Sequence, residues 1–429
     1  MDYKPESANR DSHRWVVFGA ISLVYFLVYF HRVSTSVIVD DLAAAFRTNA
    51  TALGFMSSMY FYLYAFEQPL VGYFTDRLGP RRLIGFSSII AAAGCFLFGL
   101  APTIAWASAG RALIGIGVGG VYVPALKALA LWFSTREFAG MLGLLMSIGN
   151  LGAVIATTPL AWAAGTWGWR PTFHLIGAVT LALSLCTLFG TRDHHALQPV
   201  RTPGPTGGAA SHGGLGSDIL RVLSSWTFWL CGLIFFGVYG TMLTLQGLWA
   251  TPFLMSALGI ERMLASKLNM LIPIGVIIGS PLFGWLSGRI SMNKYRTLIG
   301  IVAGLNLTWA ALIFLHAPLG ATGLALVQLA MGVCAGGFLS IFWSIVKEAT
   351  DPSILGLTLG LMNPAPFLGV AAFQVVTGII LDQAGETGGL YSLAGFERAF
   401  MVCLAANLFC LVLAYLVHKG IPGKRMDRF

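Results

Sequence analysis

The chain alternates between long apolar stretches and short polar breaks along its whole length. The apolar stretches fall at about residues 15–38, 51–74, 82–101, 104–133, 139–163, 170–190, 226–254, 266–288, 297–316, 320–346, 354–381 and 396–418. About 20 apolar residues in a helix cross a bilayer core of about 30 Å, and each stretch is at least that long. The pattern therefore predicts an all-α membrane protein with twelve transmembrane helices, numbered here as spans 1 to 12.

One polar interval is much longer than the others. Residues 191–224 are rich in Gly, Pro, Ser and His, which is typical of a flexible linker. This interval separates spans 1 to 6 from spans 7 to 12. The predicted domains are a cytoplasmic N-terminus (1–14), a six-helix bundle (15–190), the cytoplasmic linker (191–224), a second six-helix bundle (225–418) and a cytoplasmic C-terminus (419–429).

The composition agrees with a membrane protein and gives its orientation. Hydrophobic residues make up 56% of the chain and charged residues 10%, against about 25% charged residues in soluble domains. The net charge is +9, yet eighteen Lys and Arg residues fall on one side of the predicted spans and five on the other. Because the positive side of such a protein is cytoplasmic, we expect a protein of the bacterial inner membrane with both termini and the linker on the cytoplasmic side. The excess charge indicates topology, not nucleic-acid binding.

The chain carries none of the common short signatures of enzymes or metal sites. Its six cysteines stand singly within apolar stretches, and no CxxC, HExxH or GxSxG pattern occurs in a loop. A disulfide framework, a thiolate metal site, a cofactor and an enzymatic reaction are therefore not expected.

The two halves repeat one another. The loop "GYFTDRLGPRRLIG" follows span 2 and "GWLSGRISMNKYRTLIG" follows span 8, while "RALIGIGVGG" in span 4 matches "QLAMGVCAGG" in span 10. Asn150 in span 5 likewise matches Asn363 in span 11. These matches predict two related bundles with a binding site between them near the bilayer midplane.

On these motifs the chain resembles the major facilitator superfamily over essentially its whole length. The first loop fits that superfamily's G-x3-D-R-x-G-x-R-R motif, and span 4 fits its R-x3-G-x-G-x-G motif through Arg111, Gly115, Gly117 and Gly119. The resemblance implies secondary active transport by alternating access. The matching residues have an expected gating role: Gly72, Asp76, Arg77, Arg81, Arg82 and Arg111. Simple anchoring of the arginines at the cytoplasmic interface is the alternative.

Within that superfamily the chain is similar to nitrate/nitrite-like or anion-symporter-like carriers and, more narrowly, to a facilitator-type protein of magnetosome membranes. The narrower resemblance implies iron transport into the magnetosome, a compartment for biomineralization. A basic cavity suits an anionic chelate such as ferric citrate better than bare Fe²⁺, which prefers His, carboxylate or thiolate ligands. The expected partners are thus a small, anionic solute, membrane lipids and protons as a coupling ion.

Arg32 is the most unusual residue of span 1. It lies 18 residues after Arg14, which places it roughly 27 Å along the helix, in the outer half of the span. A permanently charged, planar guanidinium suits a carboxylate or phosphate. Anion binding is one interpretation, and pairing with Asp40 or Asp41 or reaching outward to the interface is the other. His31 points about 100° away and is a candidate for titration or for a structural hydrogen bond.

Two further ionisable residues lie inside spans. Glu67 is the only carboxylate well within one, and Lys127 in span 4 is expected at a similar depth. A Glu67–Lys127 pair would serve either proton coupling or structure, and Lys127 is also a candidate for binding substrate charge directly.

In this superfamily spans 1, 4, 7 and 10 line the cavity. The predicted substrate-binding residues are Arg32, Tyr29, Tyr122, Lys127, Gln246, Trp249, Asn150 and Asn363; the predicted residues for proton coupling or an ion pair are Glu67, Lys127 and His31. Pro364 and Pro366 predict a bend in span 11.

Two functions from different classes fit this sequence. The first is a transporter of a small polar or anionic solute. The second is a non-transporting sensor or assembly scaffold with the same fold. Charged residues inside the spans together with gating loops favour transport, because a scaffold requires neither.

Overall fold

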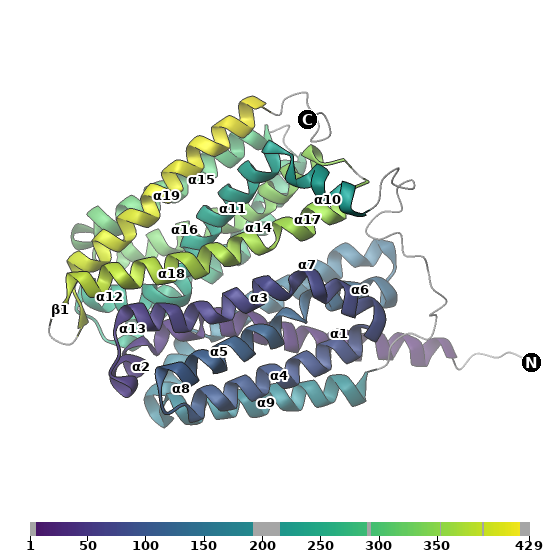
Figure 1. The fold of residues 1–429 in the computed structure, drawn as a ribbon, viewed down its shortest axis with the longest axis horizontal. Coiled ribbons are helices and arrows are strands. Elements are labelled where there is room, and N and C mark those ends of the chain that lie inside the picture. Colours follow the sequence, from purple (N-terminus) through teal and green to yellow (C-terminus); the bar gives the residue numbers. More distant parts are fainter. Residues whose placement is uncertain (1–5, 192–214, 290–292, 352, 388–389, 421–429) are drawn as a thin grey trace, which may run out of the picture. The chain divides into compact units, whose positions relative to one another are not determined.

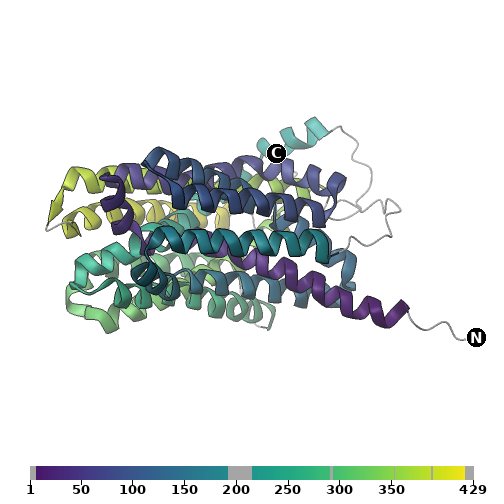
Figure 2. The same ribbon diagram turned by 90° about the horizontal axis from the view of Figure 1, so that it is seen from below.

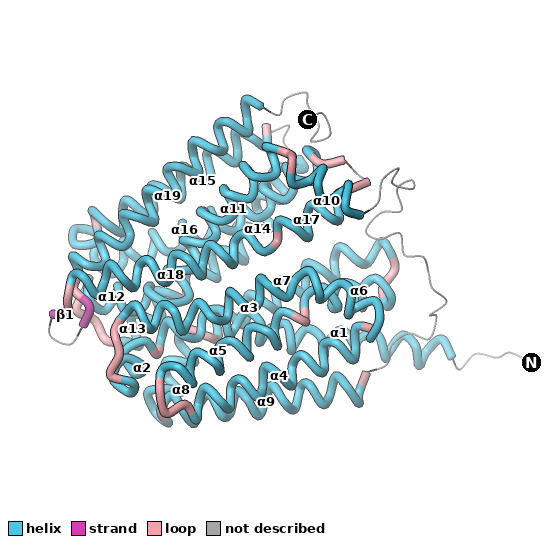
Figure 3. The backbone as a smooth tube through the Cα atoms, in the orientation of Figure 1, coloured by secondary structure: helices cyan, strands magenta, loops and turns pink. Residues whose placement is uncertain are grey.

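The computed structural model describes residues 6–191, 215–289, 293–351, 353–387 and 390–420. The described residues are almost entirely helical, as Figure 3 shows, and the one pair of strands, β1 (Glu386–Thr387) and β2 (Leu390–Tyr391), forms a short antiparallel hairpin. The all-α class expected from the apolar pattern is confirmed. Most of the predicted linker and both extreme termini lie outside the described residues.

The chain divides into two compact units. Unit 1 comprises Met1–Thr48 and Met59–Leu197, and unit 2 comprises Asn49–Ser58 and Gln198–Phe429. The boundary in the linker falls where the polar interval of the sequence lies. The ten residues Asn49–Ser58, which hold the first turns of one helix, belong to unit 2.

Unit 1 packs its helices in pairs: α4 against α5 and α9, and α1 against α7 (Figure 1). Its elements are α1 (Glu6–Val33), η1 (Ser34–Val37), α2 (Val39–Phe46), α3 (Ala50–Leu78, continuing from unit 2), α4 (Pro80–Leu100), α5 (Ile104–Gly119), α6 (Tyr122–Trp132), α7 (Thr135–Ile155), α8 (Thr158–Trp167) and α9 (Trp169–Gly190).

Unit 2 packs α14 against α16, α11 against α18, and α15 against α16 and α19 (Figures 1 and 2). Its elements are α10 (Leu215–Leu223), α11 (Trp226–Thr244), the π-helical turn η2 (Leu245–Trp249), α12 (Ala250–Leu258), α13 (Arg262–Asn269), α14 (Leu271–Arg289), α15 (Lys294–Phe314), α16 (His316–Ala349), α17 (Leu355–Met362), α18 (Pro364–Ala384), β1, β2 and α19 (Leu393–Gly420). The helix α10 lies inside the interval predicted as linker.

Eleven helical segments of the described chain are long and apolar enough to cross a membrane. The expected span 2 is not among them by composition, because α3 carries polar side chains such as Glu67, Gln68 and Asp76. Its 29 residues nevertheless extend over about 44 Å, which exceeds a bilayer core. The expected span that is missing from this set is the one that supplies several side chains to the candidate site.

Five of the expected spans are interrupted helices. Span 4 is α5 and α6, span 5 is α7 and α8, span 7 is α11, η2 and α12, span 8 is α13 and α14, and span 11 is α17 and α18. Glycine or proline lies close to each interruption: Gly120, Pro159, Gly247, Pro273 and Pro364. Proline cannot donate the helical hydrogen bond and glycine weakens a helix interior, so these positions are where the regular helix ends most easily. The interruption at Asn363 confirms the predicted break of span 11.

The glycines of the span 4 motif allow close approach between helices of unit 1. A methyl group at Gly115 would lie 2.4 Å from the carbonyl oxygen of Tyr60 in α3, and one at Gly117 would lie 2.3 Å from the backbone nitrogen of Ala91 in α4. Both distances are shorter than van der Waals contact, so only glycine fits. Small residues at helix interfaces are the usual device for tight packing in membranes.

In unit 2 the first turn of α3 is bound by a carboxylate from α18. The Asp382 Oδ1 accepts from the backbone N–H of Ala50 at 2.7 Å, and Oδ2 accepts from the N–H of Thr51 at 2.9 Å and from the Thr51 hydroxyl. The first N–H groups of a helix have no partner within the helix. A carboxylate there also interacts favourably with the helix dipole, so this contact fixes the start of α3.

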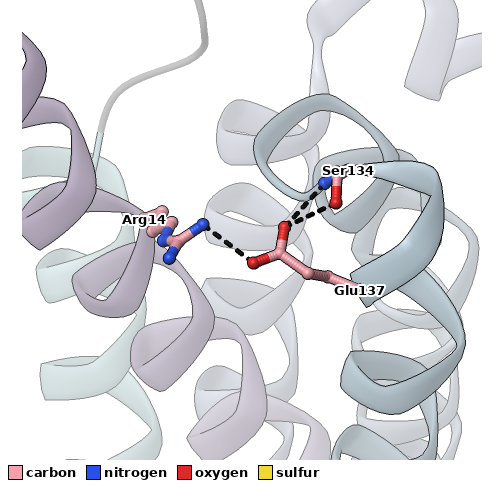
Figure 4. Close-up of polar contacts among 3 residues, drawn as sticks. All are labelled: Arg14, Ser134 and Glu137. Atoms are coloured by element: carbon pink, nitrogen blue, oxygen red, sulfur yellow. Dashed lines mark hydrogen bonds and ion pairs between the residues drawn. The ribbon is translucent and has the colours of Figure 1, made fainter.

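An ion pair and a capping box hold the start of α7 in unit 1 (Figure 4). The Glu137 Oε2 accepts from the backbone N–H of Ser134 at 3.0 Å and from its hydroxyl at 2.8 Å, and the Arg14 Nη1 lies 3.1 Å from Glu137 Oε1. These donors favour the ionised carboxylate. The Ser134 N–H and hydroxyl, followed by Arg14, therefore hold the pKa of Glu137 below its ordinary value.

We predict that Gly115→Ala lowers the thermal unfolding midpoint of the purified protein. The added methyl group forces α3 away from α5, and overpacking of this kind typically costs about 1–3 kcal/mol. Gly143→Ala is the matched control, because a methyl group at Gly143 has no atom within 4 Å. Equal midpoints for the two variants would show that the α3–α5 contact does not limit stability.

We also predict that the stabilisation by Glu137 depends on pH. Because the pKa of Glu137 is lower in the folded protein than its reference value of 4.5, its contribution is complete above that pH and is lost as the pH falls through the folded-state value. The difference in unfolding midpoint between the parent and Glu137→Gln should be largest near neutral pH and vanish in acid. A difference that stays constant with pH would contradict the assignment.

Candidate functional site

Arg32 lies in the last turn of α1, and its side chain is buried within unit 1. The residue is 6% exposed, its Nη2 donates to the Tyr64 hydroxyl at 3.3 Å, and its guanidinium carbon lies 4.5 Å from the centre of the Tyr29 ring and 5.4 Å from that of Tyr64. Tyrosine faces attract a cation, and more strongly where water is excluded. The guanidinium therefore faces aromatic and hydroxyl groups of α1 and α3.

Three tyrosines from two helices form a row next to this guanidinium. Tyr25 meets Tyr29 with ring centres 5.3 Å apart and stacks on Tyr122 at 5.7 Å, with 23° between the two planes. The Tyr25 hydroxyl donates to the Met146 sulfur at 3.5 Å. A methyl group at Gly149 would approach both Tyr25 and Tyr29 to about 3 Å, so α7 meets α1 closely at this point.

The structure thus brings together three of the predicted substrate-binding residues, Arg32, Tyr29 and Tyr122. Met146 and Gly149 on α7 complete this group. The sequence pattern does not distinguish these two residues from the others of their span, so they were not predicted. Asn150, predicted to bind substrate, donates its amide to the Met146 carbonyl of its own helix at 3.0 Å. This bond is local to α7.

Arg111 lies in the core of unit 1 and not at its cytoplasmic end. It is fully buried in α5, its Nη1 donates to the His31 carbonyl at 3.0 Å, and its guanidinium carbon lies 4.9 Å from the Tyr60 ring centre. Among the described residues its Nε and Nη2 have no hydrogen-bond partner. Arg111 was predicted to act with the loop residues in gating. The structure places it against the backbone of His31, the residue that precedes Arg32.

His31 is completely buried on the opposite side of α1 from the tyrosine row. Its Nε2 lies 3.6 Å from the Cys95 sulfur of α4, and its ring meets Phe30 edge to face. The expected structural hydrogen bond is consistent with this position. A role of His31 in proton coupling stays a prediction.

The structure pairs Lys127 with Asp76, which corrects the expected Glu67–Lys127 pair. The Lys127 Nζ lies 2.6 Å from Asp76 Oδ1 and donates to the Thr75 carbonyl at 3.3 Å. The reason is the reach of the lysine side chain, whose flexible carbon stem carries the ammonium group toward the more polar end of the bundle. In this structure Lys127 of α6 contacts the loop motif through Asp76 and, among the described residues, forms no hydrogen bond or ion pair with the group around Arg32.

Glu67 has no ion-pair partner among the described residues. Its Oε1 is buried and has no hydrogen-bond partner among the described residues, and it lies where a side chain at position 119 would begin, 1.4 Å from the ideal Cβ position of Gly119. Gln68, the next residue of α3, donates its amide to the Gly119 carbonyl at 3.4 Å. Both residues therefore meet the end of α5.

The predicted gating loop is held inside unit 1 by several contacts. The Arg81 Nη1 donates to the carbonyls of Leu188 and Thr191 at the end of α9, at 3.2 and 3.3 Å, and the Arg77 guanidinium lies 4.5 Å from the Tyr73 ring centre. Gly79 has a φ of 78°, a conformation that favours glycine, directly before α4. These contacts fit anchoring as well as gating, so gating by Gly72, Asp76, Arg77, Arg81 and Arg82 stays a prediction.

In unit 2, Gln246 and Trp249 lie in the π-helical turn η2. Trp249 is fully buried and its indole N–H donates to the Thr377 hydroxyl at 2.7 Å, while Asn269 donates to the Gln246 carbonyl and to the Thr251 hydroxyl, each at 3.3 Å. Thr377 and Asn269 were not predicted. Single π-helical turns within α-helices often occur at functional sites. The residue spacing of this sequence does not predict such a turn.

Comparison with known proteins agrees with this architecture. The model of the Major Facilitator Superfamily matches residues 21–374. The chain is 25% identical to the probable sulfoacetate transporter SauU of Cupriavidus necator over 384 residues (87% of this chain and 88% of the relative), and 22% identical to the probable galactarate/D-glucarate transporter GudP of Bacillus subtilis (98% and 94%).

A crystal structure of a bacterial homolog of the human lysosomal transporter Spinster has the same fold, with a TM-score of 0.76 at 16% identity, covering 96% of this chain and 98% of that one. The match of the family model extends over most of the two units and includes both sequence motifs. It identifies a multi-pass membrane transporter and not an enzyme. The chain belongs to the Major Facilitator Superfamily.

Proposed function

We propose that this protein is a secondary transporter of a small organic anion and that Arg32 binds its carboxylate or sulfonate group. The observation that carries the proposal is the buried Arg32 guanidinium, which lies against Tyr29 and Tyr64 within unit 1. The guanidinium stays charged at any physiological pH and offers a fork of N–H donors to a planar or tetrahedral anion.

The names of the relatives support the same class of solute. Sulfoacetate carries a carboxylate and a sulfonate, and galactarate and D-glucarate each carry two carboxylates along a chain of hydroxyl groups. The hydroxyls of Tyr29, Tyr64 and Tyr122 would suit the hydroxyl groups of a sugar acid. Completion of the site by Gln246, Trp249, Asn150 and Asn363, as the sequence predicts, is part of this proposal.

Iron transport into a magnetosome stays a prediction from the resemblance alone. Neither relative named above is described as an iron carrier. Among the described residues no group of three or more His, Cys, Asp or Glu side chains is arranged to hold a metal ion. An anionic chelate such as ferric citrate fits the Arg32 site on the charge argument, and free Fe²⁺ does not.

The test is a solute panel in proteoliposomes, with and without an imposed pH gradient. Galactarate and sulfoacetate are the anionic probes, galactitol is the uncharged counterpart of galactarate, and ferric citrate and free Fe²⁺ test the iron prediction. We expect uptake of at least one organic anion and none of galactitol. Transport of galactitol or free Fe²⁺ in place of the anions would contradict the proposal. No uptake of any solute would favour the sensor or scaffold alternative.

We predict that Arg32→Gln lowers anion uptake at least about tenfold, because hydrogen bonds to a charged group typically contribute about 1.5–3 kcal/mol. Arg170→Gln is the matched control. Arg170 donates to the Ala101 carbonyl and stacks on Trp169, away from the tyrosine row. If both variants lost uptake equally, or if Arg32→Gln kept it, Arg32 would not be the anion-binding residue.

We predict that Tyr64→Phe weakens anion binding without removing transport. Loss of the hydroxyl that accepts from Arg32 leaves the guanidinium less well oriented, and a single hydrogen bond of this kind is worth about 0.5–1.5 kcal/mol. The KM for the transported anion should therefore rise about two- to twelvefold, with little change in kcat. Tyr62→Phe, two residues earlier on α3, is the control and should leave KM unchanged.

A further inference from the structure

The end of α5 is occupied by two consecutive side chains of α3. The Glu67 carboxylate fills the space that a side chain at Gly119 would need, and the Gln68 amide donates to the Gly119 carbonyl at 3.4 Å. The last carbonyls of a helix have no partner within it. Gln68 therefore satisfies one of the carbonyl groups that the interruption of span 4 leaves open, and Glu67 lies against the same residue.

The interruption itself is short and tightly packed. After Gly119, Gly120 has φ −74° and ψ 19°, Val121 has φ −109° and ψ −46°, and α6 begins at Tyr122. A methyl group at Gly120 would lie 2.2 Å from the Ser87 hydroxyl oxygen of α4. A change in the volume or charge next to Gly119 therefore acts at the junction of α5 and α6.

Among the described residues, the carboxyl group of Glu67 has no ion-pair partner that would fix its ionisation. Its Oε1 has no hydrogen-bond partner among the described residues. The phenol of Tyr64, one turn earlier on α3, interacts with it electrostatically, and Lys127 of α6 is paired with Asp76. From α5 the carboxylate meets Gly119, and the α4 residue next to the break, Ser87, lies at Gly120. A buried carboxylate oxygen without a donor is costly, and a bound proton removes that cost.

The far side of the interruption leads to the anion site. Tyr122, the first residue of α6, stacks on Tyr25, Tyr25 meets Tyr29, and the Arg32 guanidinium lies over the Tyr29 ring. These contacts join the break in span 4 to Arg32 through three rings. A shift of α6 changes the position of the ring that begins this row.

We propose that Glu67 takes up and releases the coupling proton, and that Gly119 is a positioning residue that holds its carboxylate against the break in span 4. When the Glu67 carboxylate binds one proton from solution it becomes a neutral carboxylic acid, and α6 changes its direction at the break. Tyr122 transmits this change to the row at Arg32. The link to an anion rests on the proposed function, whereas the response of the break to the proton does not.

The experiment follows α6 with a fluorine probe in the full-length protein in nanodiscs. Val123→Cys, next to Tyr122, is labelled with a trifluoromethyl reagent in a Cys186→Ala, Cys334→Ala background, because the other four thiols are buried. The ¹⁹F spectrum is recorded from about pH 5 to about pH 10, a range that covers the ionisation of perturbed carboxyl groups. Labelling precedes the titration, so the reactivity of the thiol does not enter the result.

We expect the parent signal to move between two limits with a single midpoint, and the Glu67→Gln signal to be independent of pH. Gly119→Ala should displace the midpoint by at least about one pH unit, which is a tenfold change in proton affinity, or abolish the transition. Gly143→Ala, with no atom near the added methyl group, should titrate as the parent does. A parent signal that does not respond to pH, or a response that persists in Glu67→Gln and disappears in His31→Gln, would overturn the assignment of Glu67.

A second arm separates this inference from the proposed function. Linkage requires that an anion whose binding is coupled to the proton moves the midpoint, with a coupling of about fivefold or more, or about 0.7 pH unit. Galactarate and sulfoacetate should move it in the parent and not in Arg32→Gln, which keeps its pH response. A normal titration that neither anion displaces would leave the role of Glu67 intact and count against the proposed solutes.

Discussion

A permanently charged guanidinium within a membrane-spanning helix is the constraint on which the design of unit 1 depends. Arginine cannot lose its proton to escape the cost of a low-dielectric environment, so its surroundings must be built for it. Here α1 turns Arg32 toward the rings of Tyr29 and Tyr64. These faces and one hydroxyl group accept the cation, and none of them has to carry a formal negative charge.

The helices around Arg32 approach one another closely because glycines lie at their contact points. Gly149 lets α7 reach Tyr25 and Tyr29, Gly115 lets α5 reach the backbone of Tyr60, and Gly119 makes room for the carboxylate of Glu67. The glycines of the span 4 motif thus face different neighbours, and only some of them serve helix packing. Gly119 differs because the space it leaves is filled by an ionisable group.

The pairing of charges divides the ionisable residues of unit 1 into two classes. Lys127 and Asp76 neutralise each other, and Arg14 and Glu137 do the same at the start of α7. Arg32, Arg111 and Glu67 are buried deeper, and their neighbours are mainly tyrosines, glycines and backbone carbonyls. Charges of the first class stabilise a helix end or a loop. Those of the second class lie where the helices of unit 1 pack together.

The sequence by itself determined the fold class and marked Arg32 as a charge within an apolar span. These properties follow from local features: the length of apolar stretches, a twofold repeat of motifs, and a charge where hydrocarbon is expected. The tertiary structure alone decided the partners. Lys127 pairs with Asp76 and not with Glu67 because a flexible side chain of that length reaches several positions, and residue spacing along a helix does not choose among them. The break at Gly120, the π-helical turn at Gln246 and the contact of Glu67 with Gly119 depend in the same way on which helices pack together. In "VYFHRVSTSV" the sequence contains both the charge and Tyr29, and the packing of α3 against α1 adds the Tyr64 hydroxyl that completes the candidate anion site.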